Sequence, residues 1–363
     1  MDNEYCNLCP RKCNADRAGI YKNTGSKTGF CGEGMNMRIA RAALHFWEEP
    51  CISGTKGSGA VFFTGCNLKC VYCQNAAISE GVSGMDCSDD TEKVDQKLSF
   101  DMSEGKQGNG TYSDTGKIGS KTGASAFRPG REVSPDELSD IFFRLKGEGA
   151  NNINLVTPSH FVPQIREAIL IAKEHGFDLP FVYNSSAYES VETLKTLEGL
   201  IDIYLPDLKY MDAKKAAAYS HAPDYPEVAK AAIAEMFRQV GEPVFAFDAE
   251  EDRSLIEKGL IVRHLVLPLG VKNACDVIDY LASTYSDRIY ISVMSQYTPL
   301  VETPGALTEA QKNRLAAFPE LARRVTKREY ERVIGHCCDL GLSNVYIQEG
   351  EAALDSFIPA WDM

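Results

Sequence analysis

The sequence lacks three features, and each absence excludes a class of protein. Asp and Glu number 51 against 38 Lys and Arg, and no basic block or stripe interrupts the net charge of −13. We therefore expect no nucleic-acid partner and no anionic membrane surface. No apolar run reaches the roughly 18 residues that a membrane-spanning helix needs. The first residues, Met1 to Tyr5, have no signal-peptide pattern, so we expect a cytoplasmic protein.

Cysteine, in contrast, is abundant, with 12 in 363 residues. In a reducing compartment this number indicates metal or redox chemistry and not disulfides. Cys66, Cys70 and Cys73 have the spacing C-x3-C-x2-C and follow the apolar run Ala60–Thr64, which is typical of a buried strand. Three thiolates leave one position of a metal centre open, whereas structural zinc sites and most iron–sulfur clusters take four protein ligands. A zinc knob or plain buried thiols are the alternatives.

The stretch Gly65–Asn75 resembles the radical SAM signature C-x3-C-x-aromatic-C, with Cys66, Cys70 and Cys73 as ligands and Tyr72 as the aromatic residue. The resemblance implies a [4Fe–4S] cluster whose free iron binds S-adenosylmethionine (SAM). An electron from the cluster would cleave SAM, and the 5′-deoxyadenosyl radical would abstract a hydrogen atom from a substrate. The cofactors carry this chemistry, and the protein orients them. Tyr72 is expected beside the adenine or as a shield of the cluster.

Residues 1–50 read as a separate cysteine-rich module. Its cysteines follow C-x2-C-x3-C, with a fourth after a Gly- and Lys-rich turn: Cys6, Cys9, Cys13 and Cys31. So small a segment cannot bury much core, and a zinc or iron ion would supply the missing stability. A second iron–sulfur cluster and metal-free thiols are the alternatives, although the spacing is not that of a ferredoxin. Arg38–Trp47 is predicted to form a short helix leading out of the module.

The rest of the chain predicts an α/β core over residues 51–83 and 131–363. The insertion 84–130 is rich in Gly, Ser, Lys and Asp and is predicted to be disordered. Ser134 and Glu137 have the pattern of a helix start with a capping box. Continuous Val, Ile and Leu runs alternate with amphipathic stretches, which is typical of a parallel sheet covered on both faces.

Counting the strand before the three cysteines, six β/α units are expected. They fit the fold that the resemblance implies, a partial (β/α)6 TIM-like barrel of the radical SAM type. The later strands are expected at 152–156, 180–183, 201–205, 260–267 and 288–294, with a last one at 344–348. Helices are expected at 164–175, 189–197, 226–240 and 328–340.

Polar residues recur at five expected strand ends, where parallel β/α folds carry their active groups. The stretches are Thr157-Pro158-Ser159-His160, Asn184-Ser185-Ser186, Asp207-Leu208-Lys209-Tyr210, Arg263-His264 and Ser295-Gln296-Tyr297. Lys209 and Arg263 would bind a carboxylate, and Asn184 a hydroxyl, of a zwitterionic ligand that carries a ribose. Each residue alone fits an ordinary loop or core position, but their coincidence at successive strand ends favours a site. His160 and Gln296 are candidates to face the substrate.

A narrower resemblance lies in Asp202–Tyr210 and Arg263–Pro268, which look like the pyruvate formate-lyase activating-enzyme group. The amino-terminal module and residues 156–160, 183–186 and 294–297 are similar to its PflX-type branch, so that the match covers nearly the whole chain outside 84–130. The resemblance places Lys209 in the SAM site and Asn184 where the group carries an aspartate. The Gly-Gly-Glu stretch of typical members is replaced here by Asn154–Pro158.

Three hypotheses of function follow. The first is a glycyl-radical-enzyme activating enzyme, which abstracts hydrogen from a protein glycine. The second is a radical SAM enzyme that acts on a small molecule or on another protein residue. The third is an iron–sulfur electron carrier or structural metal protein, against which the open three-cysteine site argues. The resemblance implies a flavodoxin- or ferredoxin-type reductant and, for the first hypothesis, a protein substrate. No catalytic acid or base is named, because radical abstraction requires none.

Overall fold

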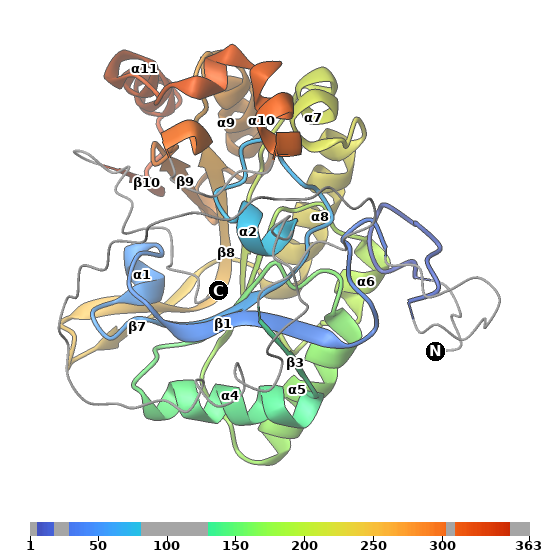
Figure 1. The fold of residues 1–363 in the computed structure, drawn as a ribbon. Helices are drawn as coiled ribbons and strands as arrows, with labels where there is room; N and C mark the ends of the chain where they lie inside the picture. Colours follow the sequence, from blue (N-terminus) through green and yellow to red (C-terminus); the bar gives the residue numbers. More distant parts are fainter. Residues whose placement is uncertain (1–5, 18–28, 81–129, 303–308, 349–363) are drawn as a thin grey trace, which may run out of the picture.

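The computed structural model describes residues 6–17, 29–80, 130–302 and 309–348 of the chain. They form a mixed α/β fold around a single sheet (Figure 1). The strands are β1 (Met37–His45), β2 (Ser58–Phe63), β3 (Arg131–Val133), β4 (Ile153–Val156), β5 (Phe181–Ser185), β6 (Ile203–Pro206), β7 (Val244–Asp248), β8 (Arg253–Leu265), β9 (Tyr290–Met294) and β10 (Val345–Ile347). The helices are α1 (Pro50–Ser53), α2 (Ala76–Ser79), α4 (Pro135–Gly147), α5 (Val162–Glu174), α6 (Val191–Lys195), α7 (Ala213–Ser220), α8 (Tyr225–Val240), α9 (Val271–Tyr285), α10 (Glu309–Ala316) and α11 (Lys327–Asp339).

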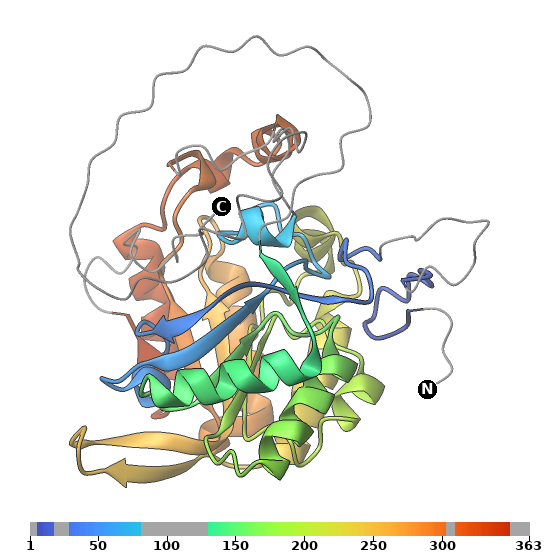
Figure 2. The same ribbon diagram turned by 60° about the horizontal axis from the view of Figure 1, so that its bottom comes forward.

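The sheet is open, and most of its strands are parallel. Its order is β10-β9-β8-β6-β5-β4-β2-β1-β3, and every neighbouring pair from β10 to β2 is parallel. β1 pairs antiparallel with β2 and β3, and β7 forms an antiparallel hairpin with β8 that extends from the body of the molecule (Figure 2). Parallel strands bring the residues that follow them to one edge of the sheet. The partial (β/α)6 barrel stays a prediction.

The strands predicted from the sequence pattern are present, and so are the helices predicted after residue 130. Residues 60–64 correspond to β2, and the six later strands correspond to β4, β5, β6, β8, β9 and β10. The four predicted helices correspond to α5, α6, α8 and α11. The capping box is confirmed, because Ser134 Oγ accepts from the Glu137 N–H at 3.2 Å and the Glu137 carboxylate accepts from the Ser134 N–H at 2.7 Å. Apart from Gly130, the insertion 84–130 lies outside the described residues.

The helix predicted for Arg38–Trp47 is wrong, because the chain there forms strand β1. Residues from Ile39 to His45 pair with β2, and Met37 to Ile39 pair with β3. Met37 and Ile39 are buried with Arg38 more exposed between them, which is the period of two that belongs to a strand. Alanine-rich segments have an intrinsic preference for helix, but pairing with the buried strand β2 overrides it here.

The two faces of the sheet are covered differently. Helices α4, α5, α8 and α9 pack on one face and form the main apolar core with it. The other face, called the α1 face below, is covered by Cys51 and Ile52 of α1. The apolar sheet residues beneath them are Val182, Ile203, Leu205 and Ile261. Two residues beyond three of these come Asn184, Asp207 and Arg263, which lie on the α1 face because side chains alternate along a strand.

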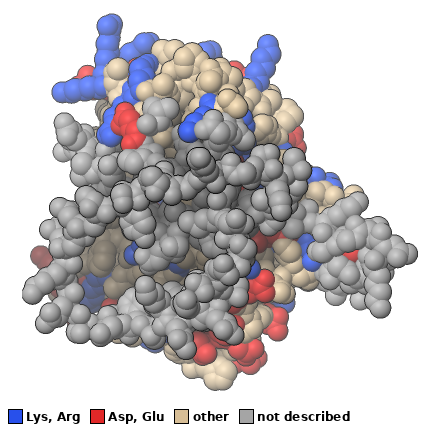
Figure 3. Space-filling model, in the orientation of Figure 1, with Lys and Arg blue, Asp and Glu red and all other residues tan. Residues whose placement is uncertain are grey.

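Charge is unevenly distributed over the described residues visible on one face of the molecule (Figure 3). On the face drawn in Figure 3, Lys and Arg side chains gather toward the end that carries α7 and α11, whereas Asp and Glu lie mostly toward the other end. Within the described ranges, no helix is both long enough and apolar enough to span a membrane.

Candidate functional site

The loop between β2 and α2 carries Cys66, Cys70 and Cys73, as the sequence predicted. The turn that starts it requires Gly65, whose φ is +78°. A Cβ at this position would lie 2.6 Å from Cγ of Glu33 and 2.9 Å from the carbonyl oxygen of Cys31. Only glycine combines this backbone conformation with so close an approach. The loop therefore has its path fixed by the amino-terminal module packed against it.

Hydrogen-bond donors surround the three half-buried thiols. The Leu68 N–H donates to Cys66 Sγ at 3.4 Å, the Ser220 hydroxyl donates to Cys70 Sγ at 2.9 Å, and the Ser79 hydroxyl lies 3.5 Å from Cys73 Sγ. Burial raises the pKa of Cys70 to about 11 and that of Cys73 to about 12. A bound metal centre would reverse these shifts, because it stabilises the thiolate. The donors would then tune the charge on the sulfurs.

The arrangement of the three sulfurs is compatible with an iron–sulfur cluster. Among the residues that the structure describes, no three His, Cys, Asp or Glu side chains are placed to hold one metal ion. A cluster spaces its ligands more widely, because each cysteine binds a different iron atom. Cys73 nevertheless interacts electrostatically with both Cys70 and Cys66, so the three sulfurs are neighbours. Three free thiols on one loop thus match the ligand set that the signature implies.

Tyr72 is buried below this loop. Its hydroxyl lies 2.6 Å from that of Tyr210, which lies 2.7 Å from the Ser220 hydroxyl. Since Ser220 donates to Cys70, a chain of hydrogen bonds joins Tyr72 to a cysteine sulfur. The ring of Tyr72 is 5% exposed and meets Tyr219 and Tyr297 edge-on. Tyr72 thus supports the cysteine loop from within the core.

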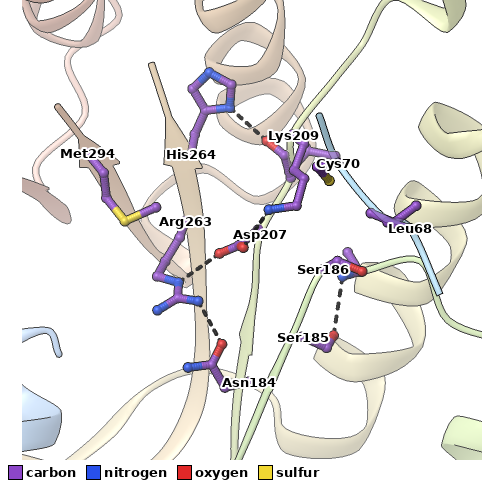
Figure 4. Close-up of polar contacts among 12 residues, drawn as sticks. Leu68, Cys70, Asn184, Ser185, Ser186, Asp207, Lys209, Arg263, His264 and Met294 are labelled. Carbon is purple, nitrogen blue, oxygen red and sulfur yellow. Dashed lines mark hydrogen bonds and ion pairs between the residues drawn. The ribbon is translucent and has the colours of Figure 1, made fainter. Parts of the chain in front are cut away.

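Next to Cys70, the strand-end residues form a connected set of charges on the α1 face (Figure 4). Lys209 Nζ lies 2.8 Å from Asp207 Oδ2, and Arg263 Nε lies 2.8 Å from Asp207 Oδ1. Arg263 also donates to Asn184 Oδ1 at 2.6 Å. Lys209 interacts electrostatically with Cys70, which places this end of the set beside the cysteine loop. The structure therefore brings together Cys70, Lys209, Arg263 and Asn184, predicted separately from four parts of the sequence.

Two residues of this set were missed in the sequence. Glu48, between β1 and α1, accepts from Arg263 at 2.9 Å and from Asn184 at 3.3 Å. Asn154 of β4 donates to the same Glu48 carboxylate at 3.0 Å. We call Glu48, Asn154, Asn184, Asp207, Lys209 and Arg263 the polar layer. The only sequence signal for Glu48 is an acidic residue between an apolar segment and Pro50, which is weak.

The charges of the polar layer determine its pKa shifts. Burial alone would raise the pKa of Asp207, but Arg263 and Lys209 hold it below its ordinary value. Burial would likewise lower the pKa of Lys209, yet Asp207 and Cys70 keep it raised. Burial raises the pKa of Glu48, with Arg263 opposing. His264 lies behind the layer, where burial lowers its pKa to about 4 and its Nδ1 lies 2.7 Å from the Leu208 carbonyl oxygen.

The other strand-end candidates lie elsewhere. His160 is buried, with Nε2 2.6 Å from the Thr64 carbonyl oxygen, and its own carbonyl accepts from Arg17 at 2.7 Å. It joins the amino-terminal module to the end of β2 and does not face the polar layer. Gln296 is half-buried and accepts from the Gln348 amide at 2.9 Å. Its backbone carbonyl accepts from Gln74 at 3.0 Å, which places it near the cysteine loop.

The four module cysteines lie near one another without converging on a single point. Cys9 and Cys31 are buried, and each interacts electrostatically with Cys6. Cys13 and Cys31 place their sulfurs 3.2 and 3.4 Å from where a Cβ of Gly29 would lie. All four are free thiols. Their chemistry suits zinc or iron, but as placed they do not form a set of ligands to one ion.

Comparisons with known proteins are distant. No family model matches the chain. An uncharacterised protein of Methanocaldococcus jannaschii is 24% identical over 335 residues, which are 91% of this chain and 73% of that protein.

Solved structures were also compared with the chain. SuiB of Streptococcus suis is 13% identical with a TM-score of 0.38 over 61% of this chain, and this chain covers only 44% of SuiB. SuiB has also been solved with SAM bound. The methylornithine synthase PylB is 14% identical with a TM-score of 0.36 and is covered over 70% of its length. These scores are too low to assign an activity, so any assignment depends on the residues of the site.

Proposed function

We propose that this protein is a radical SAM enzyme. The observation that carries the proposal is the placement of Cys66, Cys70 and Cys73 on the loop after a parallel strand, with the charged pair Lys209 and Asp207 directly beside Cys70. An electron carrier needs no buried charges next to its cluster. A site for a zwitterionic cofactor does, because the cofactor's carboxylate must exchange water for protein donors.

The three cysteines would hold a [4Fe–4S] cluster. When bound, the cluster with SAM supplies a 5′-deoxyadenosyl radical for hydrogen abstraction. Leu68, Ser79 and Ser220 would stabilise the thiolates through the hydrogen bonds described above. The remaining residues orient SAM and keep water out.

Lys209 is the residue we propose to contact SAM directly. Its ammonium has three N–H donors, and one of them is directed at Asp207. Arg263 has its donors directed at Asp207, Glu48 and Asn184. Lys209 therefore has two N–H donors left to bind a carboxylate, whereas all three nitrogens of Arg263 already donate within the layer. Arg263 positions the residues around it, and Asn184 contributes an amide where the activating enzymes carry an aspartate.

The test is SAM cleavage by the anaerobically reconstituted protein with dithionite. We expect 5′-deoxyadenosine from the wild type and none from Cys70→Ala, because two cysteines do not retain the cluster. Cys275→Ala, in a half-buried thiol on α9, is the matched control and should keep the wild-type rate. A cluster-loaded wild type that forms no 5′-deoxyadenosine would contradict the proposal and favour an electron carrier.

The finer assignment, an activating enzyme of the pyruvate formate-lyase type with a partial (β/α)6 barrel, is supported by Asp202–Tyr210 around β6. A glycyl-radical EPR signal in a co-incubated glycyl-radical enzyme would test it. The alternative is a small-molecule substrate or another protein residue. It is favoured by the stretch Asn154–Pro158, which stands where typical members carry Gly-Gly-Glu, and by Asn184, which stands where they carry an aspartate. Both Asn154 and Asn184 donate to Glu48.

Two further components belong to the proposal. The amino-terminal module would hold a zinc or iron ion through Cys6, Cys9, Cys13 and Cys31, whose sulfurs would have to move closer together to bind one ion. This is supported by four neighbouring free thiols that share no disulfide. The electron would come from a flavodoxin- or ferredoxin-type reductant.

A further inference from the structure

The end of the polar layer that contains Glu48 is completed by a second buried carboxylate, that of Glu49. Glu49 is 8% exposed, interacts with the Ser292 side chain and lies close enough to Arg263 and Glu48 to interact electrostatically with both. Ser292 comes from β9, the strand next to β8. The α1 face thus presents polar side chains from several adjacent strands to two successive glutamates.

Two buried acceptor atoms in this region have no hydrogen-bond partner among the described residues. They are Oε2 of Glu49 and Oδ1 of Asn154. Both adjoin Glu48: Asn154 donates its amide to Glu48, and Glu49 follows it in the chain. Buried acceptors in proteins are nearly always satisfied, so each of these two atoms on either side of Glu48 indicates a missing donor.

Rearranging the existing groups does not satisfy these atoms. Turning the Asn154 amide over would lose its hydrogen bond to Glu48 and place its NH2 group where Oδ1 now lies, so a donor without an acceptor would replace an acceptor without a donor. Protonating Glu49 at Oε2 would replace an acceptor without a donor by a donor without an acceptor. The missing group must therefore come from outside the described residues.

The balance of charge indicates the sign of that group. Arg263 interacts with three carboxylates: Asp207, Glu48 and Glu49. Asp207 is already paired with Lys209. Glu48 and Glu49 are left to share Arg263 as their cation. Burial raises the pKa of both, with Arg263 opposing, and when both are ionised the buried set carries one negative charge more than its cations. A ligand that supplies N–H donors and a positive charge would correct both defects.

We infer that the substrate presents a cationic nitrogen with N–H donors, an ammonium or a guanidinium group, to Glu49 and Asn154. The inference rests on the proposed function, because it places this group on the same polar layer as the residue that would bind SAM. The ammonium of SAM is not the expected occupant. Lys209 and Asp207 lie between the cysteine loop and Arg263, and Glu48 and Glu49 lie on the far side of Arg263.

Two isomeric cations provide the probe. n-Butylammonium and tetramethylammonium have the same formula and charge, but only the first has N–H donors. We expect the thermal midpoint of the full-length, anaerobically reconstituted protein to be higher in n-butylammonium chloride than in equal tetramethylammonium chloride. The difference should disappear in Glu49→Gln and in Asn154→Ala. Equal midpoints for the wild type in the two salts would overturn the inference.

Glu189→Gln is the matched control, since Glu189 is also a buried glutamate but contacts Ser159 and Tyr183 outside the polar layer. It should keep the difference between the salts. Glu49→Gln should itself fold, because it removes a buried charge without a full partner.

Adding SAM separates the two candidate occupants. If SAM abolishes the difference, its own ammonium fills the site, and the substrate assignment is wrong. A retained difference supports the assignment. The 5′-deoxyadenosine assay is read separately: a salt difference without SAM cleavage would contradict the enzyme but leave the cation site standing.

Discussion

At the scale of single residues, polar side chains at strand ends divide between function and support. Ser159 and Ser185 follow parallel strands and were expected to line the site. Instead, both interact with the carboxylate of Glu189, to which the Tyr183 hydroxyl also donates at 3.2 Å. Burial raises the pKa of Glu189 to about 7, although these donors oppose the shift. A buried carboxyl group of this kind makes stability depend on pH.

The pH prediction concerns Glu189→Gln. Between its ordinary pKa of 4.5 and the folded pKa of about 7, the folded protein keeps a proton that the unfolded chain has released. Stability from this group is therefore fully present at low pH and lost as pH rises through that window, by roughly 3 kcal/mol in total. Urea unfolding at about pH 5 and about pH 8 should show a smaller loss in the variant than in the wild type.

The control is Glu192→Gln, at an exposed glutamate on α6. It should lose as much stability over the same pH range as the wild type does. A Glu189→Gln variant with the wild-type pH dependence would show that Glu189 titrates normally in the folded protein.

The sequence predicted the site residues that belong to a recognisable motif. It did not predict the residues that join the site only through the folding of distant segments. The spacing of Cys66, Cys70 and Cys73 identifies them as candidate ligands. The position of Lys209 after a buried strand identifies it as a candidate site residue. Glu48 contacts the layer because the preceding strand β1 pairs with β2. This long-range pairing has no local signal in the sequence. The wrong helix prediction for β1 therefore also concealed Glu48 and Glu49.

At the scale of elements, the β2–α2 loop depends on one backbone conformation. Gly65 has φ +78°, and a side chain there would meet Glu33 and the Cys31 carbonyl at under 3.0 Å. We expect Gly65→Ala to destabilise the protein by about 1–3 kcal/mol and to reduce its iron content, because the strained turn displaces the cysteine that follows. Denaturant unfolding and metal analysis of the reconstituted protein measure the two effects.

Gly335→Ala is the matched substitution. Gly335 lies in α11, is exposed, and has nothing within 4 Å of an added Cβ. Alanine is the better helix former, so this variant should gain about 0.5–1 kcal/mol and keep its iron. If both variants lost stability equally, the conformation of Gly65 would not be the cause.

At the scale of the whole molecule, the amino-terminal module and the cysteine loop form one interface. Arg11 of the module donates to the carbonyl oxygens of Asn67 at 2.7 Å and Ser220 at 3.0 Å, and its guanidinium lies 4.0 Å from the centre of the Phe30 ring. The Thr64 hydroxyl donates to Glu33 at 3.1 Å. The module therefore supports the loop that would hold the cluster.

This arrangement predicts two metal sites that bind their metals separately. Loss of the module metal should weaken the cluster site, but loss of the cluster should not affect the module metal. Cys66→Ala should lose the cluster and keep the module metal, because the contacts made by Arg11 and Thr64 do not involve that sulfur. Cys9→Ala should lose the module metal, and the loosened module should then lower cluster occupancy only in part. Iron and zinc analysis of the two variants and of Cys275→Ala, which should match the wild type, measures this. Equal loss of both metals in both variants would mean that the seven cysteines serve a single centre.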